Sequence, residues 1–140
     1  MLIVFNTAPM NEKVFSYPLD KIDIFVVNEI EGAGLSGCNS SDYQEIIKAL
    51  KERFPDKQIV MTVGESGSYY IHNDELIHQD AYKVEAIDTT AAGDTFTGFF
   101  LASYLKDRDI PKALDLAAKA SSITVQGKGA AQSIPSIDQL

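Results

Sequence analysis

Short apolar runs, each ended by polar or glycine-containing residues, limit the folds that this chain can adopt. Three of them have the length and composition of buried β-strands: Leu2–Phe5, Asp23–Val27 and Gln58–Val63. Longer segments with apolar residues at helical spacing lie between and after them. Because buried strands that alternate with helices pack into layers, the sequence predicts an α/β fold with a mainly parallel sheet.

The predicted helices have recognisable ends. The first begins at Ser41, with Ser40 or Ser41 as its cap, and Pro55 closes it. The second covers Thr95–Leu105, and the third starts with Pro111 at its first position and runs to about Val125.

Two further strand signals follow the third apolar run. Ser68–His72 and Glu75–His78 flank Asn73-Asp74, which predicts a β-hairpin. Tyr82–Ala86 alternates apolar and polar residues and is predicted to be another strand.

Composition narrows the functional class. A chain of 140 residues with 45% hydrophobic residues is typical of one soluble globular domain. It has no apolar run long enough to cross a membrane, and Met1–Phe5 lacks the basic residues of a signal peptide. The single cysteine, Cys38, excludes an internal disulfide and fits a reducing cytoplasmic setting; no neighbouring group would activate it as a nucleophile. The net charge of −8 argues against a nucleic-acid partner, but not against ATP.

Three loops follow the predicted strands: Asn28–Glu31, Gly64–Gly67 and Asp88–Asp94. In open α/β sheets, ligands bind beyond the carboxyl ends of the strands. We therefore expect these loops to converge on one site.

The third loop carries the most chemical information. Asp88 and Asp94 lie six residues apart, separated by small residues and hydroxyls, and an apolar helical pattern follows. Free N–H groups at a helix start bind anions, but a carboxylate there repels an anion unless it accepts a proton from a neighbouring group. The arrangement indicates phosphoryl transfer to an alcohol with Asp94 as base. An ordinary strand-to-helix turn with a capping aspartate is the alternative.

The order of residues in this loop resembles that of a known family, the ribokinase-like (phosphofructokinase-B type) carbohydrate kinases. Asp88–Gly98 is similar to the family's Asp-Thr-x-Gly/Ala-Ala-Gly-Asp signature. Four other segments, in the same order, resemble family motifs: Asn6–Pro9 (Asn-Pro-Ala-Pro), Asn28–Glu31 (Asn-x-x-Glu), Thr62–Gly67 (Thr-x-Gly-x-x-Gly) and the closing residues 128–135. Alone, the second and third of these also fit ordinary turns.

The resemblance implies a role for each matching position. Asp94 would be the catalytic base, and the amides of Ala91, Ala92 and Gly93 would form an anion hole for the phosphoryl group. Asn28 and Glu31 would organise the nucleotide phosphates and Mg²⁺, through water. The residues implied to bind the nucleotide are Asn28, Thr62, Gly64, Gly67, Gly93 and Lys119. Lys119 lies where the family often has Asn or His, which leaves the adenine contact open.

The family also binds a monovalent cation, largely through backbone carbonyls. The resemblance implies that the candidate K⁺ ligands here are Asp88, Thr90, Thr124, Gly127, Gly129 and Ser133. Such ligands leave almost no trace in a sequence.

The resemblance covers only the C-terminal half of that family. The chain is therefore expected to be a single partial domain over residues 1–140 of a three-layer, doubly wound fold, lacking the sugar-binding half. A strand at Leu2–Phe5 would then leave an apolar edge, so we expect either self-association or a missing N-terminal half as partner. The predicted function is ATP-dependent phosphorylation of a sugar, with little activity for the chain alone.

Two other functions remain open at this point. A non-catalytic nucleotide-binding or assembly module could keep the fold, but nucleotide binding does not require Asp94. A Rossmann-type oxidoreductase is disfavoured, because the Gly-x-Gly-x-x-Gly opening with a downstream acid is missing.

Overall fold

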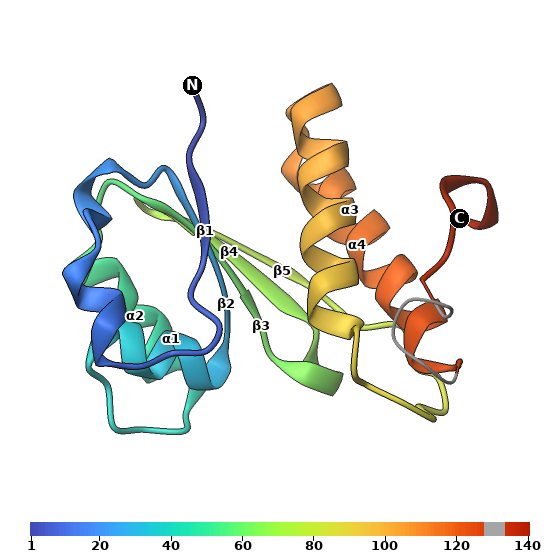
Figure 1. The fold of residues 1–140 in the computed structure, drawn as a ribbon, viewed down its shortest axis with the longest axis horizontal. Coiled ribbons are helices and arrows are strands. Elements are labelled where there is room, and N and C mark those ends of the chain that lie inside the picture. Colours follow the sequence, from blue (N-terminus) through green and yellow to red (C-terminus); the bar gives the residue numbers. More distant parts are fainter. Residues whose placement is uncertain (128–133) are drawn as a thin grey trace. The chain divides into compact units, whose positions relative to one another are not determined.

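The computed structural model describes residues 1–127 and 134–140. The chain forms two compact units, one of residues 1–63 and 69–78, the other of residues 64–68 and 79–140. Five β-strands and four α-helices lie within the described residues (Figure 1), which confirms the predicted α/β class.

One sheet contains all the strands, in the order β1-β2-β3-β4-β5. They are β1 (Val4–Asn6), β2 (Ile24–Asn28), β3 (Gln58–Thr62), β4 (Ser68–His72) and β5 (Glu75–Gln79). β2 is parallel to both β1 and β3. The links from β3 to β4 and from β4 to β5 are too short for a parallel crossover, so these pairs are antiparallel. The sheet is therefore mixed, and the prediction of a mainly parallel sheet was wrong in this respect.

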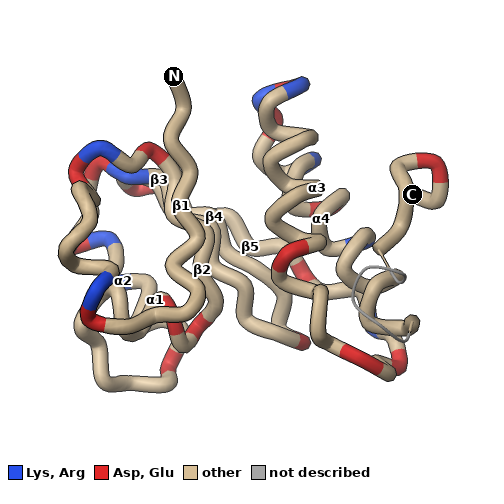
Figure 2. Tube along the Cα trace, in the orientation of Figure 1, with Lys and Arg blue, Asp and Glu red and all other residues tan. Residues whose placement is uncertain are grey.

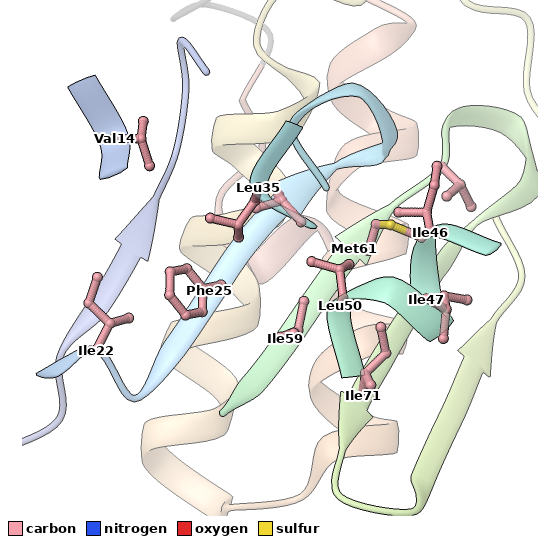
Figure 3. Close-up of a cluster of buried hydrophobic side chains, with 12 residues drawn as sticks. Val14, Ile22, Phe25, Leu35, Ile46, Ile47, Leu50, Ile59, Met61 and Ile71 are labelled. Carbon is pink, nitrogen blue, oxygen red and sulfur yellow. The ribbon is translucent and has the colours of Figure 1, made fainter. Parts of the chain in front are cut away.

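Two helices of the first unit, α1 (Glu29–Ser36) and α2 (Tyr43–Arg53), pack against each other, and α1 also contacts β2 and β3. Side chains alternate across a strand, so Phe25 and Val27 of β2 point to the same face as Ile59 and Met61 of β3. With residues of α1 and α2 they form the hydrophobic core drawn in Figure 3. Burial of each such side chain stabilises the fold by about 1.5–3 kcal/mol.

The ends of α2 follow from local sequence. Asp42 is its N-cap, and its carboxylate accepts a hydrogen bond from the N–H of Gln44 at 2.8 Å. The sequence predicted Ser40 or Ser41 as the cap; instead Ser40 Oγ accepts from the N–H of Asp42. The helix ends at Arg53, two residues before Pro55, as predicted.

In the second unit, α3 (Ala92–Asp107) packs against α4 (Ile110–Val125). Phe96, Phe100 and Tyr104 stack one helical turn apart along α3. Arg108, in the left-handed conformation, ends α3, and Asp109 caps α4 by accepting the Lys112 N–H at 3.1 Å. Pro111 falls in the first turn of α4, close to its predicted position.

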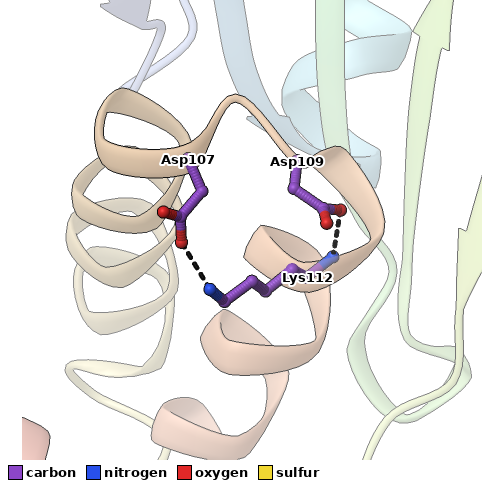
Figure 4. A network of polar contacts seen from close by, with 3 residues as sticks. All are labelled: Asp107, Asp109 and Lys112. Atoms are coloured by element: carbon purple, nitrogen blue, oxygen red, sulfur yellow. Dashed lines mark hydrogen bonds and ion pairs between the residues drawn. The ribbon is translucent and has the colours of Figure 1, made fainter.

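An ion pair connects the end of α3 to the start of α4 (Figure 4). Lys112 Nζ lies 2.5 Å from Asp107 Oδ2 on the surface. The hydrogen bond from Lys112 lowers the pKa of the Asp107 carboxyl and raises that of the Lys112 ammonium. The pair therefore favours the charged form of both groups.

The predicted strand at Tyr82–Ala86 does not form. These residues are exposed, and none belongs to a strand of the sheet. The Tyr82 hydroxyl donates to Asp115 of α4, which raises the pKa of the phenol. Alternating polarity predicted a strand, but a strand also requires a neighbouring backbone to pair with.

No helix in the described part of the chain is long and apolar enough to span a membrane. Acidic residues outnumber basic ones, 20 to 12, and Figure 2 shows them in both units. No Lys or Arg lies between Lys83 and Lys106, so the segment that leads into α3 carries no cationic side chain of its own.

Candidate functional site

In the first unit, the predicted metal and phosphate residues lie where β2 becomes α1. Asn28 is the N-cap of α1: its side-chain oxygen accepts the Glu31 N–H at 2.8 Å. In return, Glu31 Oε2 accepts the Asn28 N–H at 2.9 Å. This is a capping box, so Asn28–Glu31 is not the loop that the sequence predicted but a strand end followed directly by a helix.

The capping box leaves oxygen atoms for a ligand. Within the described residues, no hydrogen bond involves the second carboxylate oxygen of Glu31, and both residues are only half-buried. Carboxylate and amide oxygens are the ligands that Mg²⁺ prefers, and Mg²⁺ keeps much of its water. No cluster of three or more His, Cys, Asp or Glu side chains exists among the residues described. These donors therefore fit a hydrated Mg²⁺ held mostly by water and phosphate oxygens.

Thr62 lies beside this capping box on the neighbouring strand. The register pairs it with Asn28, and its hydroxyl lies 3.5 Å from the carbonyl oxygen of Val27. The structure therefore brings together three of the predicted residues, Asn28, Glu31 and Thr62.

Gly64 and Gly67, in the second unit, form a tight turn. The Gly67 N–H donates to the Gly64 carbonyl at 3.1 Å, and both residues have positive φ, +58° and +96°. A Cβ on Gly67 would lie 1.9 Å from the carbonyl oxygen of Gln79, whereas one on Gly64 would meet no atom within 4 Å. The backbone thus requires glycine at Gly67 for steric reasons, whatever its role toward a nucleotide.

Asp88 orders the loop that leads into α3. Its carboxylate accepts hydrogen bonds from the backbone N–H of Thr90, at 2.9 Å, and from the Thr90 hydroxyl. The N–H groups of Ile87 and Asp88 both donate to the carbonyl of Val125, the last residue of α4. The loop is thereby fixed to the C-terminal end of α4.

The start of α3 presents backbone donors without a side-chain cap. Ala91 is the N-cap and offers no acceptor, while the Ala92 N–H donates to the Thr89 carbonyl at 3.2 Å. Within the described residues, the N–H groups of Gly93 and Asp94 meet no acceptor. Of the three predicted anion-hole amides, that of Ala92 is therefore already engaged.

Asp94 lies in the first turn of α3 and is exposed to solvent. The sequence predicted a helix from Thr95, but α3 begins three residues earlier, so the carboxylate is part of the helix. There the carboxylate lies at the positive end of the helix dipole. The side chain is accessible from solvent.

Two polar contacts that no motif indicated attach the start of α3 to α4. Ser121 Oγ donates to the Ala92 carbonyl at 3.0 Å, and the buried hydroxyls of Thr124 and Thr95 lie 3.1 Å apart. Small hydroxyl residues inside an apolar helix pattern gave no signal that could have located these contacts from sequence.

The candidate K⁺ ligands are partly brought together. Asp88 and Thr90 lie in the loop bound to the end of α4, where the Thr124 carbonyl accepts the Gly127 N–H at 3.2 Å. Gly129 and Ser133 lie outside the described residues. Lys119, the candidate nucleotide contact on α4, donates instead to the carbonyl of Leu140.

Comparison with known proteins gives the family. The model of the pfkB family carbohydrate kinases matches residues 2–137. The chain belongs to the pfkB family of carbohydrate kinases. The resemblance that the motifs indicated is thereby confirmed.

Relatives within this family are sugar kinases. The chain is 42% identical over 141 residues to a ribokinase of Staphylococcus aureus, covering 98% of this chain and 46% of that protein. It is 36% identical to a deoxyribokinase of Salmonella typhi, covering 98% of this chain and 45% of that one. The chain thus spans about half the length of the curated relatives it matches.

Solved structures show the same fold. The structure of Arabidopsis thaliana ribokinase complexed with ribose and ATP matches with a TM-score of 0.85 at 29% identity. The match covers 96% of this pfkB-family chain and 45% of the plant protein.

Proposed function

We propose that this chain is the nucleotide-binding and phosphoryl-transfer part of an ATP-dependent kinase that phosphorylates a hydroxyl of a ribose-like sugar. The observation that carries the proposal is the start of α3, where free amides and an exposed carboxylate lie within one helical turn. Family membership and the ribose and ATP bound by the plant relative support it.

Asp94 is proposed to be the catalytic base. Its carboxylate accepts the proton of the sugar hydroxyl as the hydroxyl oxygen bonds to the γ-phosphorus of ATP, and the bond from phosphorus to the bridging oxygen of ADP breaks. The amides of Gly93 and Asp94, with those of Ala91 and Ala92, are proposed to stabilise the negative charge on the transferring group. The Ala92 N–H would have to leave the Thr89 carbonyl to take part.

The remaining roles are proposed from the resemblance to the family. Asn28 and Glu31 are proposed to hold water molecules of a nucleotide-bound Mg²⁺, which supplies charge neutralisation at the phosphates. Thr62, Gly64 and Gly67 are proposed to line the nucleotide pocket. Asp88, Thr90, Thr124 and Gly127 are proposed to hold K⁺ together with Gly129 and Ser133.

We further propose that residues 1–140 form one partial domain, the C-terminal half of a three-layer, doubly wound fold. The chain's coverage of about 45% of its relatives supports this. The proposed state of the chain alone is self-associated, because β1 is an outermost strand of the sheet. Efficient sugar phosphorylation would then need the part of the kinase that this chain does not cover.

The test is a fusion of this chain with the part of the Staphylococcus aureus ribokinase that it does not cover. With ribose and ATP, Asp94→Asn should lower kcat about 10²–10⁴-fold, the usual contribution of a general base, and leave ATP affinity nearly unchanged. Glu85→Gln, at an exposed carboxylate of the same unit, is the matched control and should keep full activity.

Full turnover by the Asp94→Asn fusion would exclude Asp94 as base. If the original fusion is active and Asp94→Asn lowers its ATP affinity together with its turnover, Asp94 has a binding role instead. A fusion that folds and binds ATP without phosphorylating any sugar would favour a non-catalytic nucleotide-binding module.

A further inference from the structure

The hydroxyl of Thr7 is buried without a hydrogen-bond partner. Thr7 directly follows β1, and the residue is 2% exposed. No donor or acceptor among the described residues meets its Oγ1. Because a buried hydroxyl without a partner costs about 1–3 kcal/mol, the fold alone gives no reason for this group.

Side-chain hydrogen bonds hold the turn that follows Thr7, but none of them involves the Thr7 hydroxyl. Asn6 Oδ1 accepts the N–H of Ala8 at 2.9 Å. The Asn11 side chain donates to the Pro9 carbonyl at 3.1 Å and accepts the N–H of Lys13 at 2.9 Å. Valine has nearly the same shape as threonine and no hydroxyl, so it would fill the space of Thr7 without leaving a buried polar group unpaired.

The position of Thr7 points to a ligand. Asn6 pairs with Val26, so the chain leaves β1 at Thr7 close to the level at which β2 ends. Asn28 at that end pairs with Thr62 on β3. Thr7, Asn28 and Thr62 thus mark the carboxyl ends of three adjacent parallel strands, the edge at which α/β sheets bind ligands.

The side-chain groups at this edge of the sheet suit a ligand that is rich in oxygen atoms. Glu31 has a carboxylate oxygen without a hydrogen bond in the described part of the chain, and a hydroxyl can donate to a phosphate oxygen or accept from a metal-bound water. A hydrogen bond to a charged group is stronger than one to a neutral group.

We propose that Thr7 is a binding residue whose hydroxyl hydrogen-bonds an oxygen of a Mg²⁺–nucleotide at the carboxyl edge of β1–β3. The proposal rests on the proposed function. Because Oγ1 is shielded from solvent, a ligand oxygen reaches it only after the residues that cover this atom move.

The test is calorimetric titration of the full chain with ADP in the presence of Mg²⁺. Thr7→Val should weaken binding about 10-fold, the loss expected for a hydrogen bond to a charged group, while Thr7→Ser should bind within about 2-fold of the original chain. The melting temperature of Thr7→Val without nucleotide should equal or exceed that of the original chain. Ser16→Ala, which removes an exposed hydroxyl from the same unit, should leave ADP binding unchanged.

The outcomes separate the two proposals. If the original chain binds ADP and Thr7→Val binds equally well, Thr7 is not a ligand residue and only this inference fails. If the original chain does not bind ADP, both proposals fail. Repeating the titration with EDTA identifies the oxygen that Thr7 contacts. If Thr7→Val still binds ADP more weakly than the original chain without Mg²⁺, the partner is a phosphate oxygen. If the difference in affinity disappears, the partner is a metal-bound water.

Discussion

Glu31 combines a structural role with a free oxygen, and this makes it the most informative residue of the first unit. One carboxylate oxygen caps α1, and the other has no hydrogen bond among the described residues. Glutamine can make the same capping hydrogen bond but carries no charge. Glu31→Gln therefore keeps the capping hydrogen bond of α1 and removes only the charge that would act on Mg²⁺. Asn28→Ala would remove the cap as well, so it could not separate the two roles.

A second carboxylate, Asp107, allows a direct test of the surface electrostatics. Its pKa is lowered chiefly by the hydrogen bond from Lys112, so Lys112→Gln should raise that pKa toward its ordinary value. Carboxyl-carbon NMR titration measures the change, and Lys83→Gln, at an exposed lysine, should leave Asp107 unaffected. An Asp107 titration that is identical in all three proteins would contradict the assigned pair.

The sign of the pH dependence follows from the two shifts. Because the pKa of Asp107 is lowered on folding, this group stabilises the fold at pH values above its pKa in the unfolded chain. That stability is lost as the pH falls through its pKa in the folded chain. The raised pKa of Lys112 contributes stability that is lost as the pH rises through its folded value. Both charges of the pair are therefore present around neutral pH. The pair contributes little to the free energy of unfolding, because both side chains are in contact with solvent.

At the scale of secondary-structure elements, the sequence predicted what hydrophobic pattern and local caps determine. The three buried strands and the β4–β5 hairpin form within one or two residues of their predicted bounds. α1 was missed because two glycines weaken its pattern, although Asn28 and Glu31 have the spacing of a capping box. Tyr82–Ala86 was predicted wrongly because pairing depends on neighbours that a local pattern does not contain.

The turn between β3 and β4 gives a prediction at this scale. Gly67→Ala should destabilise the fold by more than about 2 kcal/mol, because it adds a backbone clash at 1.9 Å to the strain of a positive φ. Gly64→Ala is the matched control: its Cβ has free space, so the cost should be about 1 kcal/mol. Urea denaturation measures both, and equal losses would contradict the assigned steric role of Gly67.

At the scale of the whole chain, the motifs identified the family because their residue types and spacing match over many positions in the same order. Composition and periodicity could not locate Thr7, since an unpaired hydroxyl is visible only when all its neighbours are known. The same limit applies to the Ser121 and Thr124 contacts that secure the start of α3. The division into two compact units likewise depends on contacts that no local pattern encodes.

Titration of the chain with ADP and Mg²⁺ by calorimetry, for the original sequence and for Glu31→Gln, tests the central claim most directly. We predict saturable binding that weakens about 10-fold in Glu31→Gln, the effect of losing one charged contact, while the melting temperature without nucleotide stays the same because the capping box is kept. Absence of binding by the original chain, or equal binding by both proteins, would contradict the account.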